Sequence, residues 1–452
     1  MTTQRNRTVR GTGRATAAAV AALCAVAALP GPAWAAGEAP YAYDSAAQRV
    51  KGAATTTDSP RLKAGSVYRD SIARDGKLYY RVDLDGVHHA YVSVVAVPPP
   101  GAKTDYSDGI KVSLQDGSGS QCGAQETQFG PAGYTRPLTA YAVREVEPGH
   151  DGGSCQSPGA YYVLVERTSK SAATPEDWGL EIRHVTEPEV KTAGPTEAPE
   201  DWPSASPQPP GGGPQKRKGG TSFHDAASVT EGEWRDDIKP GETLFYRVPV
   251  NWGQQLFATA ELGSSPTGDE YVSNALVLSL DNPAGGHVDD NTLSYNGKQA
   301  TLALDPNPPV AYANRFDSDN SVSAVRFAGW YYLSATLNPD LAAEYGDKPV
   351  PLTLRVNVVG KANNGPGYVG DPGPFAVTDD DRDAAASGQS GAEAEATSGT
   401  MKVVAATGIG AGAVLLLGLG GWTLAARRRA AQEAAAARTA QGPTQYGPPP
   451  AW

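Results

Sequence analysis

The sequence lacks most of the side chains from which catalytic and metal centres are built. Of its 452 residues only three are cysteine and six are histidine. It has neither the G-x-S-x-G turn of hydrolases nor the H-E-x-x-H helix of zinc proteases, and no Cys or His pair has the spacing of a zinc site. The nearest string, residues 220–224 (GTSFH), lacks the final glycine. These absences predict a protein that is not an enzyme and that needs no cofactor. A site assembled from distant residues stays open.

Positive charge is scarce between the two ends of the chain. Residues 36–401 hold 48 acidic and 29 basic side chains, an excess of 19 negative charges. A surface this acidic repels the phosphate backbone of nucleic acid, so we expect no nucleic-acid partner.

Long apolar runs are confined to the two ends of the chain. Residues 403–426 contain no charged side chain, and three arginines, residues 427–429, follow them. A helix of this length extends about 36 Å, enough to cross a hydrocarbon core of about 30 Å. The arginines place the tail, residues 427–452, in the cytoplasm. Gly408 and Gly412 form a small-residue face on this predicted transmembrane helix, which leaves a homodimer open.

The other apolar run belongs to a predicted signal peptide, residues 1–35. Four arginines precede residues 15–29, and the motif Ala33-Trp34-Ala35 predicts cleavage between Ala35 and Ala36. A signal peptide and a C-terminal span together predict a single-pass type I protein of the plasma membrane. Its N-terminal region then lies outside the cell.

Cysteine is rare outside the signal peptide as well. Only Cys122 and Cys155 remain in the mature chain, 33 residues apart. An even pair in an extracellular region predicts a disulfide, with two free buried thiols as the alternative. Closing that loop contributes about 3–4 kcal/mol by reducing the entropy of the unfolded chain.

Between the two ends the pattern is that of short strands. Residues 45–185 contain runs rich in Val, Ile and Tyr, such as 90–97 (AYVSVVAV), separated by Gly, Pro and Asp. Such runs predict an all-β sandwich. Residues 221–360 repeat the pattern with loops of different length, which is typical of a duplicated domain. The matched segments are 68–70 with 234–236 and 78–82 with 244–248 (offset 166), 159–162 with 329–332 (offset 170), and 180–183 with 352–355 (offset 172).

The same segments carry a family resemblance. The G-x-x-Y-R-D start at 65–70, the Y-R-V strand at 80–82, the V-S-L strand at 112–114 and the close P-G-A-Y-Y-V-L-V at 158–165 resemble the bacterial pre-peptidase C-terminal domain. The resemblance covers both repeats. It implies two tandem jelly-roll-like β-sandwich domains, residues 45–185 and 221–360. It also implies a non-catalytic accessory or binding role.

Two segments differ in composition from the repeats. Residues 186–220 are rich in Pro, Gly and polar residues, and we expect a linker there. Residues 361–402 run from a Gly/Pro segment into an acidic one, and we expect a disordered stalk that holds the domains away from the membrane.

Several candidate ligand sites have a simpler structural interpretation. Adjacent histidines, His88 and His89, point to opposite faces of a strand, so we expect a solvated pair rather than a metal site. Three acidic turns leave calcium open, although none fits an EF-hand loop and turn preferences explain each. They are residues 83–86, 289–291 and 317–320. Several aromatic side chains could stack on sugar rings in an exposed strip, but we expect most of them to pack in the core. They are Trp178, Trp234, Trp252, Trp330, Tyr79, Tyr80, Tyr161 and Tyr162.

These observations favour a membrane-anchored, surface-displayed protein of the bacterial cell envelope that binds a protein or a wall glycan. The alternative is an accessory subunit of a separate membrane or secreted hydrolase, as the family resemblance suggests. The alternatives differ in what the structure has to show. A glycan binder needs aromatic side chains along a groove, and an enzyme needs a pocket where His and carboxylates converge.

Overall fold

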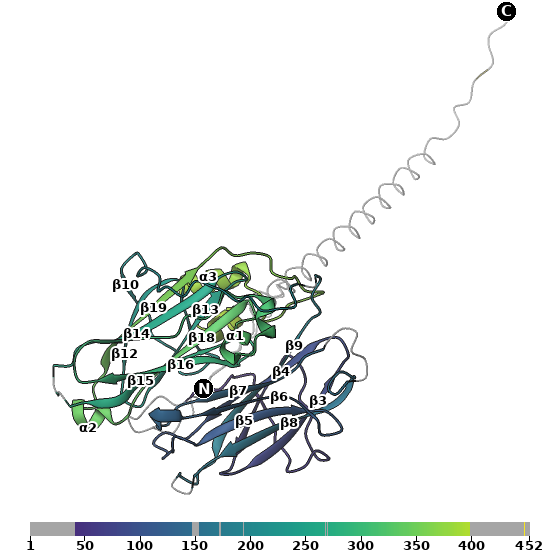
Figure 1. The fold of residues 1–452 in the computed structure, drawn as a ribbon, viewed down its shortest axis with the longest axis horizontal. Coiled ribbons are helices and arrows are strands. Elements are labelled where there is room, and N and C mark those ends of the chain that lie inside the picture. The colour runs from purple at the N-terminus through teal and green to yellow at the C-terminus, as the bar shows by residue number, and fades with distance from the viewer. Residues whose placement is uncertain are drawn as a thin grey trace, which may run out of the picture. The chain divides into compact units, whose positions relative to one another are not determined.

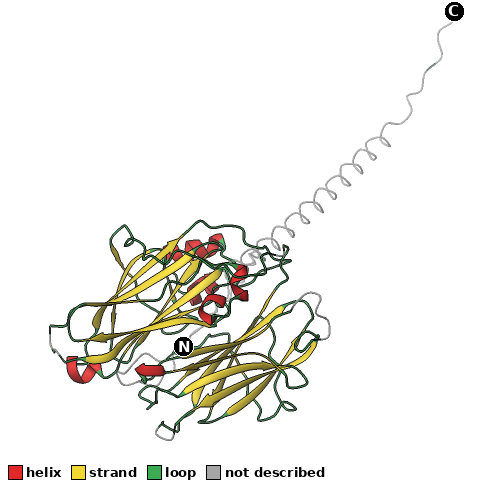
Figure 2. Cartoon of the chain, in the orientation of Figure 1, coloured by secondary structure: helices red, strands yellow, loops and turns green. Residues whose placement is uncertain are grey.

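A computed structural model describes residues 41–146, 153–170, 173–192, 194–266, 268, 270–397 and 447. Strands dominate these residues (Figure 1 and Figure 2), which confirms the predicted all-β class. The predicted signal peptide with its Ala35/Ala36 cleavage site lies outside them. The predicted span with Gly408 and Gly412 also lies outside the described residues, and so does the predicted tail apart from Gly447. None of the helices in the described ranges has the length and apolar character needed to cross a membrane.

The first repeat forms a sandwich of two sheets, here called 1A and 1B. Sheet 1A has the strand order β1-β2-β9-β4-β7, and sheet 1B has the order β3-β8-β5-β6. The strands are β1 (Gln48–Arg49), β2 (Ser66–Ile72), β3 (Lys77–Leu84), β4 (His89–Val97), β5 (Gly109–Gln115), β6 (Gln121–Gln128), β7 (Leu138–Arg144), β8 (Gly159–Thr168) and β9 (Trp178–Glu187), with a 3-10 turn η1 at Gly130–Ala132.

The second repeat forms sheets 2A and 2B. Their strand orders are β10-β12-β19-β14-β17 and β11-β13-β18-β15-β16. The strands are β10 (Pro214–Lys216), β11 (Ala227–Ser228), β12 (Gly232–Ile238), β13 (Thr243–Val250), β14 (Gln255–Leu262), β15 (Val272–Asp281), β16 (His287–Tyr295), β17 (Ala300–Ala303), β18 (Gly329–Leu337) and β19 (Val350–Val359). Short helices are η2 (Tyr312–Phe316), α1 (Asn320–Ser323), α2 (Leu341–Tyr345) and α3 (Asp379–Ser387).

The two repeats share one topology. Apart from the short edge strands β1, β10 and β11, each strand of the first sandwich has its counterpart ten strands later, at the same place in the sheet. The pairing register agrees as well. Tyr68 lies opposite Ile182, and Trp234 lies opposite Leu354. These pairs are related by the offsets of 166 and 172 that the sequence shows, so the paired strands follow the predicted alignment of the repeats.

Each sandwich has a core between its two sheets. In the first, Tyr80 and Val112 of sheet 1B pack with Val92 and Ile182 of sheet 1A, and all four are buried. Alternate residues along a strand face opposite sides of a sheet, so the neighbours of these core residues face outward. That alternation decides which side chains meet between the sandwiches.

The disulfide between Cys122 and Cys155 is confirmed. The two Cα atoms are 5.6 Å apart, and the bond links β6 to the turn that precedes β8. The first sandwich alone has this bond among the described residues. It lies near Arg144, whose guanidinium Nε donates a hydrogen bond to the Cys155 carbonyl at 2.7 Å.

The segments predicted as a linker and a stalk are folded onto the sandwiches where the structure describes them. Trp202 donates a hydrogen bond to the Pro306 carbonyl, and Gln255 donates one to Pro203. Phe375 is fully buried, and α3 is closed by a capping box at Thr378. In the described ranges 186–192, 194–220 and 361–397, these segments therefore make specific contacts with the sandwiches. A few aromatic anchors order polar segments whose average composition suggests disorder.

Candidate functional site

The outer faces of sheets 1A and 2B line a cleft between the sandwiches. It consists of two adjoining cavities of about 460 Å³ and about 720 Å³. We call them together the inter-sandwich cleft. Strands β4 and β9 form one wall, and β13 and β18 form the other. Both cavities are lined by Arg183, Arg247, Pro374, Tyr332, Gly391 and Glu395.

On the first wall, alternation along β9 sends charged side chains into the cleft. Leu180 and Ile182 are buried in the core, so Glu181 and Arg183 between and beside them face outward. In the ladder Arg183 lies opposite Ser93, and Glu181 lies opposite Val95. The side chain of Arg183 makes no hydrogen bond or ion pair with any of the described residues. This wall therefore presents an unpaired cation.

The second wall holds an arginine with a fixed orientation. Arg247 lies opposite Tyr332 in the ladder of β13 and β18, and its guanidinium lies 4.0 Å from the centre of the Trp330 ring. Its Nε donates to the Ser228 hydroxyl at 2.8 Å. Although only 8% of Arg247 is exposed, its Nη1 has no hydrogen-bond partner among the described residues. Stacking and two hydrogen bonds, to the Ser228 hydroxyl and to the Ser390 carbonyl, thus hold a guanidinium that keeps free donors.

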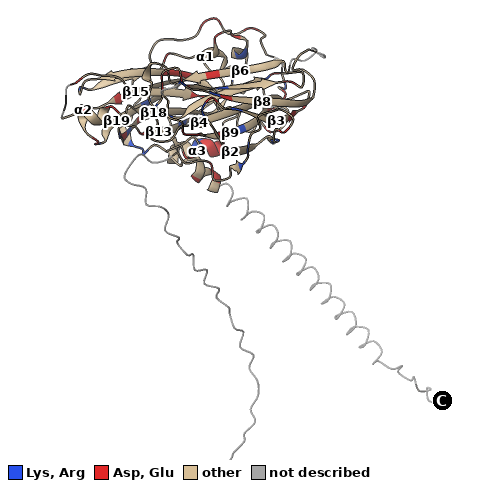
Figure 3. Cartoon of the chain, turned by 90° about the horizontal axis from the view of Figure 1, so that it is seen from below, with Lys and Arg blue, Asp and Glu red and all other residues tan. Residues whose placement is uncertain are grey.

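The C-terminal segment supplies a further side of the cleft. Trp330 donates a hydrogen bond to Asp381 of α3 at 2.8 Å, and Ser390 forms a β-bridge with Ala227. Gly391 approaches so closely that an added Cβ would collide with the His224 carbonyl oxygen. The acidic residues of α3 are visible as red ribbon in Figure 3. The segment just before the predicted span thus contributes to the cleft.

A histidine and several carboxylates meet at one end of the cleft. His224 Nδ1 lies 3.8 Å from Asp44 and 3.9 Å from Glu395, both beyond hydrogen-bond length. Glu181 accepts from the Asp44 amide at 3.0 Å and from the Tyr41 hydroxyl at 3.2 Å. Burial raises the pKa of Glu181 above its ordinary value. In the described part of the chain no hydroxyl or thiol is hydrogen-bonded to His224.

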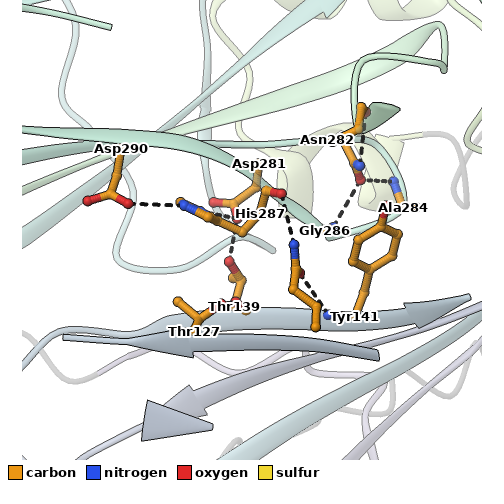
Figure 4. A network of polar contacts seen from close by, with 11 residues as sticks. Thr127, Thr139, Tyr141, Asp281, Asn282, Ala284, Gly286, His287 and Asp290 are labelled. Atoms are coloured by element: carbon orange, nitrogen blue, oxygen red, sulfur yellow. Dashed lines mark hydrogen bonds and ion pairs between the residues drawn. The ribbon is translucent and has the colours of Figure 1, made fainter. Parts of the chain in front are cut away.

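Beside the cleft, a turn of the second sandwich packs directly on sheet 1A (Figure 4). The Asn282 side-chain oxygen accepts from the amides of Ala284 and Gly286 and fixes the turn. A Cβ added at Gly286 would lie 2.5 Å from the Tyr141 ring, and one at Gly285 would lie 2.5 Å from the Ser93 hydroxyl. Only glycine permits this approach.

A polar network that runs from buried Thr139 and Asp281 to exposed Asp290 continues this contact (Figure 4). Thr139 of β7 donates a hydrogen bond to Asp281 of β15. His287 lies 3.8 Å from Asp281 and 3.1 Å from Asp290. Burial lowers the pKa of His287, but the two carboxylates outweigh this and raise it to about 10. The network joins the sandwiches and holds a protonated imidazole at neutral pH.

A second buried network joins the sandwiches to the C-terminal segment. Glu187 accepts from the hydroxyls of Tyr91 and Tyr368, each at 2.7 Å, and burial raises the pKa of this carboxyl. Arg326 pairs with Glu145 of the first sandwich. Because a broken buried ion pair leaves an uncompensated charge, such contacts hold the two sandwiches in one arrangement.

The residues singled out from the sequence occupy different places. Trp178, Trp234, Trp252, Tyr80 and Tyr161 are buried, as the core-packing interpretation predicts, while Tyr79, Tyr162 and Trp330 are half-buried. The expected solvated pair is wrong for one member, since His88 is half-buried and hydrogen-bonded to Asp85, whereas His89 is buried and lies 3.1 Å from the Tyr312 hydroxyl.

The acidic turns have partners within the protein. Asp83 pairs with Arg61 and Arg81, Asp290 pairs with His287, and Asp319 caps α1 by accepting from the Ser321 amide. No cluster of three or more potential metal ligands occurs in the ranges that the structure describes. Sequence patterns did not single out Arg183 or Arg247. Each of them occupies an outward position of a strand at which the other repeat also has an arginine. This correspondence can be recognised only when the repeats are aligned.

Comparison with known proteins adds no assignment. No protein-family model matches the sequence, and no characterised protein matches it significantly. Among solved structures, the chain resembles a broad bean stain virus protein (10% identity, TM-score 0.18, covering 70% of this chain and 98% of that one). It also resembles the tandem CBM22-1–CBM22-2 domains of Paenibacillus barcinonensis Xyn10C (11% identity, TM-score 0.17, covering 66% and 92%).

Tripeptidyl peptidase 2 is similar at 8% identity and a TM-score of 0.20, covering 73% of this chain and 28% of the peptidase. These TM-scores are all below 0.5, so none of the three similarities carries an argument about function.

Proposed function

We propose that this protein is a membrane-anchored, surface-displayed binding module of the bacterial cell envelope, that it is not an enzyme, and that its ligand occupies the inter-sandwich cleft. The observation that carries the proposal is the cleft itself. It is lined by both repeats, and its two shared arginines keep free donors. Clefts of a few hundred Å³ with a few convergent polar groups are the usual form of a ligand site.

The finer parts of the proposal come from the sequence. We propose that each sandwich is a jelly roll of the pre-peptidase C-terminal type, because the main strands of both repeats alternate between two sheets along the chain, apart from the hairpins β5–β6 and β15–β16, which each lie within one sheet. Residues 1–35 and 403–426 are proposed to export and anchor the chain, with the N-terminal region outside the cell. The ligand is then an envelope component, either a protein or a wall glycan, and no metal or other cofactor is needed.

The test is co-sedimentation of the full-length protein, held in lipid nanodiscs, with isolated cell walls. Saturable pelleting that free wall fragments compete away supports the proposal. A parallel sample with calcium chelator decides whether the acidic turns take part, since loss of pelleting there would implicate them. No pelleting in either sample contradicts wall-glycan binding. It directs the search to a protein partner in the membrane, as in the alternative of an accessory subunit of a separate hydrolase.

The meeting of His224 with Asp44 and Glu395 favours one competing function, an acid–base hydrolase. Incubation of the same preparation with wall glycan and analysis for new reducing ends separates the two functions. Release of soluble fragments that disappears in His224→Ala would contradict a purely binding role.

A further inference from the structure

The two arginines shared by both cavities of the cleft differ from their counterparts in the other repeat. At the offset of 172 Arg183 corresponds to Arg355, and at the offset of 166 Arg247 corresponds to Arg81. Arg355 is neutralised by Glu261 at 2.9 Å and Glu233 at 3.2 Å. Arg81 is neutralised by Asp83 at 2.8 Å. At both equivalent positions of the other repeat, the arginine is therefore paired with carboxylates of the protein itself.

At the cleft all three of these acidic positions are occupied by apolar residues. Val95 and Val67 stand where the second repeat has Glu261 and Glu233, and Pro249 stands where the first repeat has Asp83. Val67 and Val95 themselves line the cleft. The consequence is that Arg183 has no ion pair among the described residues, and that Arg247 has hydrogen bonds only to uncharged groups there.

We propose that a carboxylate of the ligand takes the place of these missing acids and is bound by Arg183 and Arg247 together, and that the ligand is an acidic saccharide. This inference rests on the proposed function and names the ligand class of the same cleft. The guanidinium group suits a carboxylate because its donors form a planar fork. Stacking on Trp330 at 4.0 Å fixes the plane of Arg247 before the ligand arrives.

The position of the arginines favours a saccharide over an extended peptide. Strand β9 lies between β2 and β4, and β13 lies between β11 and β18. Their backbone groups are used in the ladders, so neither strand offers an edge that a peptide would extend. Recognition must come from side chains. The half-buried ring of Tyr332, directly opposite Arg247, provides a face for a sugar ring.

The surrounding acids restrict the ligand further. Asp44, Glu181 and Glu395 line the same cleft and repel a dense polyanion such as a polyphosphate. Isolated carboxylates, one to a sugar ring, avoid that repulsion. Glu395 is the one acid that lines both cavities, and its side chain is 70% exposed, so it is free to move away when the ligand carboxylate binds.

The experiment is calorimetric titration of the full-length protein in nanodiscs with trigalacturonic acid, with its methyl ester, and with an acidic hexaglutamate peptide. We expect the acid to bind about tenfold or more tightly than the ester, because the ester keeps the sugar rings and removes the charge. Arg183→Gln should reduce affinity for the acid by a similar factor. Equal binding of acid and ester, no binding of either, or tighter binding of the peptide would overturn the proposal.

Matched variants keep the test independent of folding defects. Arg355→Gln changes the equivalent arginine of the second repeat and should leave affinity unchanged. Val95→Glu restores at the cleft the carboxylate that the second repeat has, and it should abolish binding by pairing with Arg183. Thermal unfolding of each variant checks its fold. If walls still pellet with the protein but the three probes do not bind, the cleft-binding function stands and the carboxylate inference fails.

Discussion

The hydroxyl of Tyr80 donates a hydrogen bond to the Asp70 carboxylate at 2.7 Å, and this contact recurs in the second repeat. Tyr246 donates to Asp236 at 2.9 Å. The same carboxylates accept the amide of Gly52 and of Gly219, each at 2.7 Å. An added Cβ at Gly52 would lie 2.8 Å from the Tyr80 ring, so glycine is required at this approach. One polar lock thus holds the N-terminal segment of each sandwich on its strands.

Removal of this lock should destabilise the first sandwich. Tyr80→Phe deletes the donor and leaves the Asp70 carboxylate with fewer partners, which should cost about 1–3 kcal/mol in the free energy of unfolding. Urea unfolding followed by tryptophan fluorescence measures the change. The matched control is Tyr79→Phe, whose half-buried side chain makes no such bond. If both variants lose the same stability, the lock is not the cause.

The turn at Gly285 and Gly286 should be intolerant of any side chain. Gly286→Ala places a methyl group against the Tyr141 ring, and we expect a loss of about 1–3 kcal/mol through overpacking. Gly211→Ala is the control, because nothing lies within 4 Å of its added Cβ. Differential scanning calorimetry separates the outcomes. An unchanged Gly286→Ala transition would contradict a close contact between the turn and sheet 1A.

His287 should make stability depend on pH on the alkaline side. Its folded-state pKa of about 10 lies above its ordinary value near 6.5, so the folded protein binds a proton that the unfolded chain releases. The stabilisation is complete below about pH 6.5 and is lost as pH rises toward 10. Hydrogen bonds to charged groups are worth about 1.5–3 kcal/mol. Unfolding free energies of wild type and His287→Gln, measured between these limits, should converge at the alkaline end. A constant difference would refute this account.

His89 should lower the stability of the folded protein as the pH falls below neutrality. Burial lowers its pKa to about 4, so below about pH 6.5 the unfolded chain takes up a proton that the folded protein excludes. Stability should therefore fall as pH decreases from 6.5 toward 4. His89→Gln introduces the residue that the second repeat has at position 255, where the side chain is likewise buried. The variant should show a flatter acid profile, and an unchanged slope would exclude His89 as its source.

The disulfide should be a stabilising element of the first sandwich. Replacing Cys122 and Cys155 by serine removes a loop constraint of 33 residues, and we expect a loss of about 3–4 kcal/mol. Unfolding of the double variant in denaturant measures the loss. Reducing agent should lower the stability of wild type by a similar amount and leave the variant unchanged, whereas an equal response of both would show that the bond does not contribute.

The repeat could be predicted from the sequence because strand segments such as Tyr80-Arg81-Val82 and Tyr246-Arg247-Val248 keep their spacing while the loops vary. The paired registers follow the same offsets. The folding of residues 361–397 could not be predicted from the sequence, because it depends on the contacts of single aromatic side chains. Phe375 lies 4.8 Å from Phe327 and 5.7 Å from Tyr91, ring centre to ring centre, and composition averages hide such contacts.

The cleft could not be predicted from the sequence for a related reason. Outward positions of β9 and β13 are recognisable from alternation, but only the packing of one sandwich on the other brings Arg183 and Arg247 to the same cavities. The ion pairs of their counterparts depend on neighbouring strands, such as Glu261 beside Arg355. A single strand read in isolation does not show whether its arginine is paired.

The most direct test of ligand binding in the cleft is protection of Arg183 from chemical modification. Full-length protein in nanodiscs is treated with phenylglyoxal, an arginine reagent, with and without soluble wall fragments, and modification is read by peptide mass spectrometry. Occupation of the cleft should slow modification of Arg183 several-fold and leave the exposed Arg235 of β12 unaffected. Equal rates at Arg183 with and without fragments, under conditions where the protein pellets with walls, would place the ligand elsewhere and contradict the account.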